Sequence, residues 1–176
     1  MDIRPVRLSD SAAIAAIYAP SVTEGVASFE LAPPTAEQMA ERIRHAAQER
    51  PWLVYEDAGS VLGYAYASPH NERPAYQWSV NVSVYVLAGS RRRGVGRALY
   101  RVLLAELKER GYYNAYAGIT LPNAASVGLH ESFGFVPVGV YRHAGFKLGR
   151  WWDVGWWQKS LCAHTVPVDP PMQLAS

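Results

Sequence analysis

The sequence predicts a single domain of the α+β or mixed α/β class, in which helices interleave with a mostly antiparallel sheet. The segment 77–86 alternates small polar and apolar side chains at every second residue, which is the period of a strand. The segment 96–110 repeats leucine and valine at every third or fourth residue, which predicts a long amphipathic helix. A chain of 176 residues can also bury a core without a disulfide or a structural metal.

The expected elements begin with a short strand over Ile3–Arg7 and a helix capped by Ser9 and Asp10. Thr35 and Gln38 form a capping-box pattern that predicts the start of a second helix. The later elements are expected, in order, as strands over Trp52–Glu56, Val61–Ala67 and Gln77–Val86, a helix over Gly96–Arg110, a strand over Asn114–Ile119, a helix over Asn123–Phe133, and strands over Phe135–Tyr141 and Trp152–Ser160. Residues 1–162 are interpreted as one domain, and residues 163–176, with three prolines, as a surface tail.

The composition excludes several classes of function. Seventeen basic and fifteen acidic side chains leave a net charge of +2, which argues against a general nucleic-acid binder. The single cysteine, Cys162, excludes an internal disulfide and a cysteine-rich zinc module, and it suits a reducing cytosol. The histidines share no metal-ligand spacing, so no metal site is predicted. The first residues lack the apolar run of a secretory signal, and no stretch of the chain is typical of a membrane span, so we expect a cytoplasmic protein.

An arginine- and glycine-rich loop is the motif most informative about chemistry. Three arginines, Arg91–Arg93, stand between a predicted strand and a predicted helix, and Gly94 and Gly96 follow them. Glycines allow a ligand to approach the backbone, and the start of a helix presents unpaired N–H groups to an anion. The pattern therefore indicates a phosphate or pyrophosphate site, although a glycine turn beside a solvated basic patch has the same residues. A Walker loop would need a lysine after Gly96, and a dinucleotide fingerprint would need a small residue in place of Leu99.

This loop, Arg91-x-x-Gly94-x-Gly96, resembles the acetyl-CoA pyrophosphate loop of the GNAT superfamily of N-acetyltransferases. Further blocks resemble the phosphinothricin and methionine sulfoximine acetyltransferase branch: Tyr76-Gln77-Trp78, Val84-Tyr85-Val86, Leu121-Pro122-Asn123, His130-Glu131, Gly134-Phe135 and the segment from Arg142 to Gln158. The resemblance extends from about Ile3 to Leu161. It implies the GNAT fold, with a mixed, mostly antiparallel central sheet of about six to seven strands flanked by about four helices.

The resemblance also implies an activity and a set of cofactor contacts. The expected reaction moves an acetyl group from acetyl-CoA to the α-amine of a small amino-acid-like acceptor, by direct attack in a ternary complex within a homodimer. The residues implied to bind the cofactor are Val84, Tyr85, Val86, Arg91, Arg92, Arg93, Gly94, Val95, Gly96, Arg97, Asn123 and Ser126. Backbone N–H groups of the segment 84–86 are implied to polarise the thioester carbonyl.

The catalytic residues implied by the resemblance are Asn81, Tyr85 and His130. The related enzymes carry a glutamate where this chain has Asn81, and an amide cannot accept the proton that the amine must lose. An amide can still hold a water molecule or orient the amine. The base could be a water chain, Glu30 or His130, or the amine could arrive neutral. His130 titrates near neutrality and could protonate the leaving thiolate or relay a proton.

Four residues are implied on the acceptor side. Phe29 and Glu30 resemble the substrate-side loop of the family, and Arg73 and Tyr76 approach from the opposite rim. A guanidinium suits a carboxylate or phosphinate, although Arg73 also fits a solvated loop charge. Two other functions remain open: an acyl-CoA-binding or sensing domain with weak catalysis, and an acetyltransferase for protein N-termini or polyamines.

Four of the six tryptophans gather between Trp151 and Trp157. In a strand, Trp151 and Trp157 share one face, and Trp152 and Trp156 share the other. Because both faces carry indoles, the second face needs a partner beyond the core. We therefore expect Trp151 or Trp157 to line the acceptor side or a dimer contact.

Overall fold

The computed structural model describes residues 1–165 and 169–172. The helices are α1 (Ser11–Thr23), α2 (Ala36–Glu49), α3 (Val95–Glu109) and α4 (Ala124–Ser132), with short 3-10 turns at Leu8–Asp10, Pro74–Tyr76 and Ala88–Ser90. The strands are β1 (Asp2–Pro5), β2 (Trp52–Asp57), β3 (Ser60–Pro69), β4 (Ser79–Val86), β5 (Asn114–Leu121), β6 (Val136–Lys147) and β7 (Arg150–Ser160). Residues 166–168 and 173–176 of the predicted tail lie outside the described residues.

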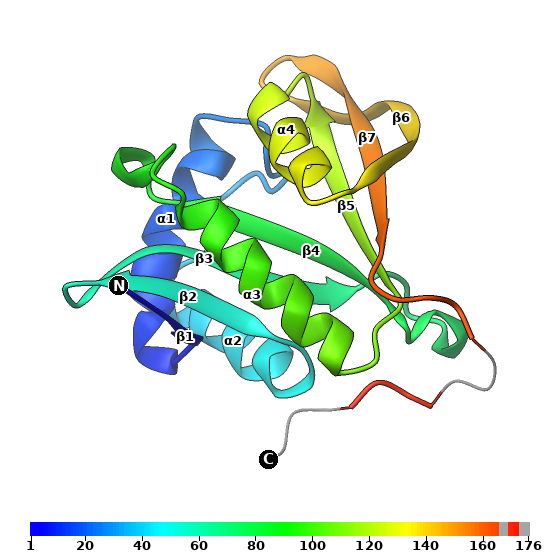
Figure 1. The fold of residues 1–176 in the computed structure, drawn as a ribbon. Coiled ribbons are helices and arrows are strands. Elements are labelled where there is room, and N and C mark those ends of the chain that lie inside the picture. Colours follow the sequence, from blue (N-terminus) through cyan, green and yellow to red (C-terminus); the bar gives the residue numbers. More distant parts are fainter. Residues whose placement is uncertain (166–168, 173–176) are drawn as a thin grey trace.

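The strands form one seven-stranded sheet in the order β1-β2-β3-β4-β5-β7-β6, which confirms the predicted mixed, mostly antiparallel arrangement. β4 and β5 are parallel neighbours, and they pair only from Ser79–Asn114 to Asn81–Tyr116. The other neighbouring strands are antiparallel. Beyond Asn81 and Tyr116, β4 and β5 diverge (Figure 1). The edge of β4 that faces β5 therefore has backbone groups without a strand partner in the described part of the chain.

The sheet is covered on both faces. α3 packs on one face, where its leucines meet Val80 and Val82 of β4. α1 and α2 pack on the opposite face, against Val54 of β2 and Tyr64 of β3, and Figure 1 shows them behind the sheet from α3. As the predicted alternation requires, successive side chains of β4 face opposite sides of the sheet, so that β4 contributes to both cores.

Local signals account for the beginnings of two helices. The Thr35 hydroxyl accepts the backbone N–H of Gln38, and the Gln38 side chain accepts the backbone N–H of Thr35, so the predicted capping box is confirmed. α3 begins after Gly94, whose φ of +85° lies in the left-handed region that favours glycine. This conformation turns the chain sharply from the arginine loop into the helix.

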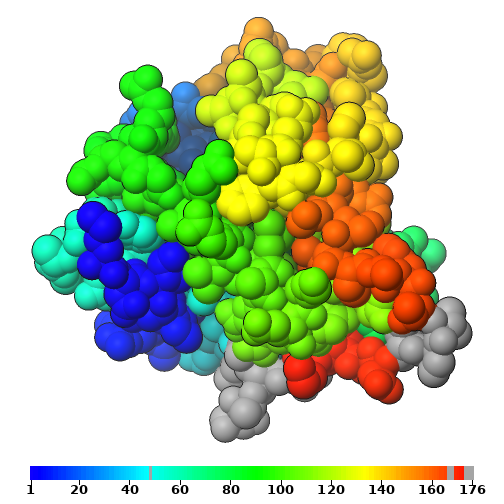
Figure 2. Space-filling view, in the orientation of Figure 1, coloured from blue at the N-terminus to red at the C-terminus, as the bar shows by residue number. Residues whose placement is uncertain are grey.

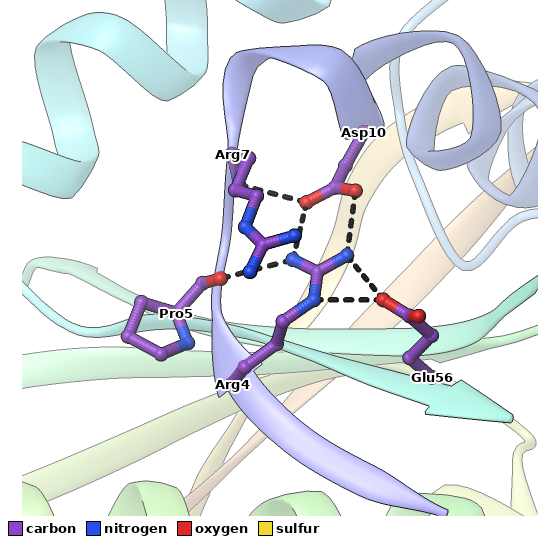
Figure 3. Close-up of polar contacts among 5 residues, drawn as sticks. All are labelled: Arg4, Pro5, Arg7, Asp10 and Glu56. Carbon is purple, nitrogen blue, oxygen red and sulfur yellow. Dashed lines mark hydrogen bonds and ion pairs between the residues drawn. The ribbon is translucent and has the colours of Figure 1, made fainter. Parts of the chain in front are cut away.

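An arginine near the start of the chain ties three elements together (Figure 3). The Arg4 guanidinium donates to both carboxylate oxygens of Asp10, at 2.8 and 2.9 Å, and to Glu56 of β2 at 2.7 Å. Burial alone would raise the pKa of Asp10, but the hydrogen bonds from Arg4 and from the Arg7 backbone lower it overall. The contact holds the entry into α1 against the first two strands.

The predicted strands differ from the observed ones by one or two residues at their ends, apart from one larger difference, and two of the differences have a local cause. The strand expected from Gln77 begins at Ser79, because Pro74–Tyr76 forms a 3-10 turn that runs up to it. The strand expected to end at Tyr141 continues as β6 to Lys147, where a tight turn joins it to β7. A bulge between Tyr141 and Gly145 breaks the two-residue alternation, which explains why the sequence pattern ended too early.

The described residues of the predicted tail contact the surface near the C-terminal end of α3. The indole N–H of Trp78 donates to the carbonyl of Asp169 at 2.8 Å, and the N–H of Met172 donates to the carbonyl of Arg110 at 2.8 Å. The boundary at residue 162 stays a prediction.

Candidate functional site

A cavity of about 990 Å³ opens where β4 and β5 part. Its walls come from the diverging strands, from the C-terminal end of α1 and the loop after it, from the arginine loop and first turn of α3, and from α4. It brings together many of the residues predicted to bind a cofactor: Val84, Tyr85, Val86, Arg91, Arg92, Gly94, Val95, Gly96, Arg97, Asn123 and Ser126. His130 also lines it, whereas Arg93 does not.

One end of the cavity is built to hold an anion. The N–H of Ala98 makes a helical bond to the Gly94 carbonyl at 2.9 Å, so the three amides before it, at residues 95–97, have no acceptor within the helix. These amides sit at the positive end of the dipole of α3. The exposed Arg91 and Arg92 add guanidinium donors beside them. The arrangement fits a phosphate or pyrophosphate group.

His130 lies in the wall that α3 and α4 share, and only 4% of its surface is exposed. Its Nε2 is 2.9 Å from the Tyr100 hydroxyl, and its Nδ1 is 2.7 Å from the Ser126 carbonyl. A carbonyl can only accept, so Nδ1 carries the hydrogen and Nε2 accepts from Tyr100. Burial lowers the pKa of His130, against the hydrogen bond to Ser126, so the ring is neutral at pH 7.

The contact between α3 and α4 encloses this histidine. Tyr100 and Phe133 meet edge to face with ring centroids 5.9 Å apart, and the Arg97 guanidinium lies 5.7 Å above the Phe133 ring. Figure 2 shows the yellow residues of α4 packed against the green residues of the α3 region. Asn123 caps α4, because its side-chain oxygen accepts the Ser126 N–H at 3.1 Å.

Tyr85 contributes a partly buried side chain to the aromatic packing under α1. Its ring lies 5.0 Å from that of Tyr18 and 5.3 Å from that of Tyr64. Burial raises the pKa of Tyr85 well above its usual range, so the phenol stays protonated and cannot serve as a base near neutral pH.

Asn81 lies just outside the cavity, at the point where β4 and β5 separate. Its side-chain oxygen is 2.9 Å from Nδ1 of His70, which follows β3. The His70 ring stacks on Tyr116 of β5 with centroids 4.1 Å apart, and the Trp156 indole lies edge-on to it at 6.1 Å. Polar and aromatic groups from β4, β5, β7 and the end of β3 thus meet just outside the cavity, where β4 and β5 separate.

The residues predicted on the acceptor side do not line the cavity. Arg42 donates to both oxygens of Glu30 at 2.7 and 2.8 Å, and the Tyr18 hydroxyl donates to the same carboxylate at 2.8 Å. The hydrogen bond from Arg42 lowers the pKa of Glu30 despite partial burial, which makes this carboxylate a poor proton acceptor. Phe29 packs against Gly145 of β6, so the loop that carries both residues is held by the β6–β7 hairpin. Arg73 and Tyr76 are exposed.

The tryptophans of β7 differ in their surroundings. Trp157 is 7% exposed and belongs to the core beneath α3, whereas Trp151 is 59% exposed near the turn of the hairpin. The Trp156 indole covers Gly118 of β5, which lines the cavity. The expectation for Trp157 does not match its position in the core, and the expectation for the exposed Trp151 stays a prediction.

Three residues near the site were missed by the sequence reasoning. Tyr100 had one detectable signal, because a tyrosine on the apolar face of a helix needs a partner for its hydroxyl. His70 and Tyr116 had no local signal, since their contacts depend on the register of three strands.

The described part of the chain contains neither a cluster of metal ligands nor a helix that could span a membrane. No three histidine, cysteine or acidic side chains come close enough to hold a metal ion. None of the helices combines the length and the apolar character needed to cross a bilayer.

A family model for acetyltransferase (GNAT) domains matches residues 3–156, which is most of the chain. The chain belongs to the GNAT acetyltransferase family. It is 38% identical to the phosphinothricin N-acetyltransferase of Streptomyces viridochromogenes, over 99% of this chain and 96% of that protein. It is 33% identical to the L-methionine sulfoximine/L-methionine sulfone acetyltransferase of Salmonella typhimurium, over 95% of this chain and 98% of that protein.

The solved structures of relatives agree with the sequence matches. A GNAT phosphinothricin acetyltransferase from Sinorhizobium meliloti, solved in complex with acetyl-CoA, superposes with a TM-score of 0.90 at 34% identity. The superposition covers 99% of this chain and 98% of that one. The GNAT fold inferred from the motifs is therefore confirmed, and the chain is an N-acetyltransferase of this family.

Proposed function

We propose that this GNAT protein binds acetyl-CoA between β4 and β5 and acetylates the α-amine of a small amino-acid-like acceptor. The observation that carries the proposal is the continuous cavity that joins an anion site at α3 to the point where β4 and β5 separate. Phosphinothricin, methionine sulfoximine and methionine sulfone are the acceptors to test first, because relatives at 33–38% identity are named for them.

The residues present fit acetyl-CoA. The free amides of Val95, Gly96 and Arg97, together with Arg91 and Arg92, suit its pyrophosphate. The unpaired edge of β4 at Val84–Val86 offers backbone N–H groups to the pantetheine arm and to the thioester carbonyl. The cosubstrate supplies an activated acetyl group on a thiolate leaving group. Asn123 and Ser126 border the same cavity from α4.

His130 is proposed to act at the leaving-group side of the reaction. It lines the cavity, and its two ring nitrogens are held by Tyr100 and Ser126. We propose that the imidazole takes up a proton from water and passes it to the departing thiolate, while the Tyr100 phenol, whose pKa burial raises, keeps its own proton.

On the acceptor side, Phe29, Arg73 and Tyr76 are proposed to contact the amino acid. The Phe29 ring provides an apolar surface, and the exposed Arg73 guanidinium suits the acceptor's carboxylate. Glu30 is proposed to fix the Phe29 loop, because its carboxylate is bound to Arg42.

CoA release from acetyl-CoA over a panel of amino-acid analogues tests the function directly. Turnover with at least one of the three acceptors supports the proposal. Acetyl-CoA binding without CoA release for any acceptor would support the alternative of an acyl-CoA-binding domain. Turnover confined to protein N-termini or polyamines would contradict the proposed acceptor class. We also propose that the reaction needs no metal, so treatment with EDTA should leave the rate unchanged. The single cysteine suits the reducing cytoplasm, which we propose as the location of the protein.

Arg91→Ala is expected to weaken acetyl-CoA binding about tenfold, equivalent to about 1.4 kcal/mol, because a charge-assisted contact to phosphate is lost. The affinity for the acceptor should not change. Arg93→Ala is the matched control, since Arg93 belongs to the same loop but does not line the cavity. Isothermal titration with acetyl-CoA measures both, and equal effects of the two substitutions would contradict the position assigned to the pyrophosphate.

A homodimer that uses β6 is also part of the proposal. β6 is an end strand of the sheet, and Val136, Val138, Val140 and Tyr141 are exposed on it. An open strand edge with apolar side chains needs a covering partner, and a second copy of the chain supplies one. Light scattering should give the mass of a dimer for the wild type and of a monomer for Val138→Lys. A monomeric wild type contradicts this part of the proposal.

A further inference from the structure

The hydrogen bonds around Asn81 determine how His70 is protonated. The Asn81 side-chain nitrogen donates to the carbonyl of Pro69 at 3.1 Å, so the amide oxygen must face His70. That oxygen lies 2.9 Å from Nδ1 of the ring and can only accept. Nδ1 of neutral His70 therefore carries the hydrogen, and the lone pair that can take up a proton is on Nε2.

Nε2 of His70 is free to act. The described residues give it no hydrogen-bond partner, and the ring is only partly covered. Two titratable side chains face the ring: Tyr116, which stacks on it, and Tyr76, whose ring centroid lies 5.9 Å away. Burial raises the pKa of Tyr116, so that phenol stays neutral. Within the described residues, the ion pair that involves a histidine is the one between His45 and Glu41, so no carboxylate is paired with His70.

His70 lies just outside the cavity, at the point where β4 and β5 separate. Asn81 and Tyr116 are the last paired residues of β4 and β5, and the next residues on each strand, from Val82 and from Ala117, line the cavity. The side chains of Asn81 and Tyr116 lie on the sheet face opposite the α3 core, because the residues on either side of each belong to that core: Val80 and Val82 on β4, and Ala115 and Ala117 on β5. The imidazole thus lies beside the point at which a bound thioester would meet an amine.

The other candidate bases are already engaged. Both nitrogens of His130 are in hydrogen bonds, and both oxygens of Glu30 are bound to Arg42. Asn81 is an amide and has no proton affinity near neutral pH. His70 is the candidate that combines a free lone pair with an orienting partner, which is the arrangement that general bases share.

We propose that His70 is the general base of the acetyl transfer and that Asn81 is its positioning residue. The inference rests on the proposed function. The amine nitrogen forms a bond to the acetyl carbon as Nε2 of His70 takes one of its protons. The carbon–sulfur bond breaks, the CoA thiolate leaves with the electron pair and is protonated, and His70 later releases its proton to water. The step is balanced without a further reactant.

Rates over a range of pH test the assignment to His70. His70→Ala should lower kcat/KM for the acceptor about 100-fold at pH 7, the lower range for loss of a general base, with an unchanged acetyl-CoA affinity. The deficit should shrink as pH rises, because the amine then arrives neutral. His45→Ala, at an exposed position on α2, is the matched control. An active wild type with an unaltered rate and profile in His70→Ala would overturn the assignment.

Substitutions at Asn81 test whether this residue orients the His70 ring or serves only to stabilise the fold. Asn81→Ala should lower kcat about tenfold with little change in KM, since the ring loses its orientation but not its basicity. Asn81→Asp should retain activity and move the acidic limb of the profile to higher pH, because a carboxylate stabilises the imidazolium. A profile for Asn81→Asp identical to that of the wild type would contradict the contact.

Nitrogen NMR gives a readout that does not depend on turnover. In the wild type, His70 should carry its hydrogen on Nδ1, and Asn81→Ala should shift the population towards the Nε2–H form. A wild-type ring with its hydrogen on Nε2 would overturn the proposal even if the enzyme is active. Conversely, no CoA release with any acceptor, despite the expected tautomer, would contradict the proposed function and leave the His70–Asn81 geometry standing.

Discussion

At one end of the cavity, the anion-binding groups come from a single stretch of chain, Arg91–Arg97. Just outside the other end, where β4 and β5 separate, a second group of residues comes from four strands or their ends: His70, Asn81, Tyr116 and Trp156. The first end consists mainly of backbone amides fixed by a helix start, whereas the second consists of side chains fixed by strand register. The proposed cofactor end is therefore locally encoded, and the proposed acceptor end depends on the whole sheet.

The difference has a chemical reason. A pyrophosphate is the same in every acetyl-CoA, and backbone N–H groups can bind it with almost any side chain beside them. An acceptor differs between enzymes, so its site needs side chains that can be exchanged. Substitutions at the two ends should accordingly affect different kinetic constants.

Gly94→Ala is expected to have the largest effect of the substitutions that test this comparison. An alanine at a φ of +85° costs about 1–2 kcal/mol, and the turn would relax by misaligning the first amides of α3. The affinity for acetyl-CoA should fall roughly 10- to 30-fold, with an unchanged KM for the acceptor. Gly89→Ala controls for the added methyl group, because Gly89 lies in the same loop and a Cβ there would meet nothing within 4 Å. A raised acceptor KM in Gly94→Ala would break the separation of the two ends.

Gly145→Ala tests the acceptor end with a smaller expected effect. A Cβ on Gly145 would overlap the Phe29 ring and displace the loop that carries it. The acceptor KM should rise about 5- to 10-fold, with acetyl-CoA binding unchanged. Gly139→Ala on the same strand is the control, since a Cβ at that position would have no atom within 4 Å. Steady-state kinetics with both substrates varied would show whether the effect reaches the cofactor end.

The sequence predicted the locally encoded parts of the molecule well. The capping box at Thr35, the helix that starts after Gly94 and the alternation of β4 all depend on residues close together in the chain. The long β6 strand was predicted too short, because the bulge after Tyr141 breaks its period. The approximate number of strands came from the family resemblance, and the order of the strands was not predicted.

The candidate site likewise has one part that local motifs predicted and another part that depends on the fold. Most of the predicted residues of the arginine loop and α4 line the cavity, with Arg93 as the exception, and their roles stay predictions. The contact between His70 and Asn81 could not be predicted, because it depends on the antiparallel register that brings Ser68 opposite Asn81. The pair of Tyr100 and His130 likewise required the docking of α4 on α3.

His130 offers the last and smallest test of the comparison, through the pH dependence of the free energy of unfolding. Burial lowers the pKa of His130 in the folded chain, whereas the pKa of a histidine in an unfolded chain is about 6.5. Between these values the unfolded chain binds more protons, so the stability that neutral His130 provides is complete above pH 6.5 and is lost as pH falls below it. The wild type should therefore lose stability between pH 7.5 and pH 5.5, a window above the range in which carboxylates such as Asp10 titrate.

Urea unfolding of His130→Gln should show a flatter pH dependence over this window than the wild type, even though the variant is less stable. His45→Gln controls for the loss of a histidine at an exposed position. An equal slope in His130→Gln and the wild type would mean that the ring is not held neutral by α3 and α4. In that case the cofactor end of the cavity would respond to pH through His130 during catalysis, and the contrast with His70 at the acceptor end would disappear.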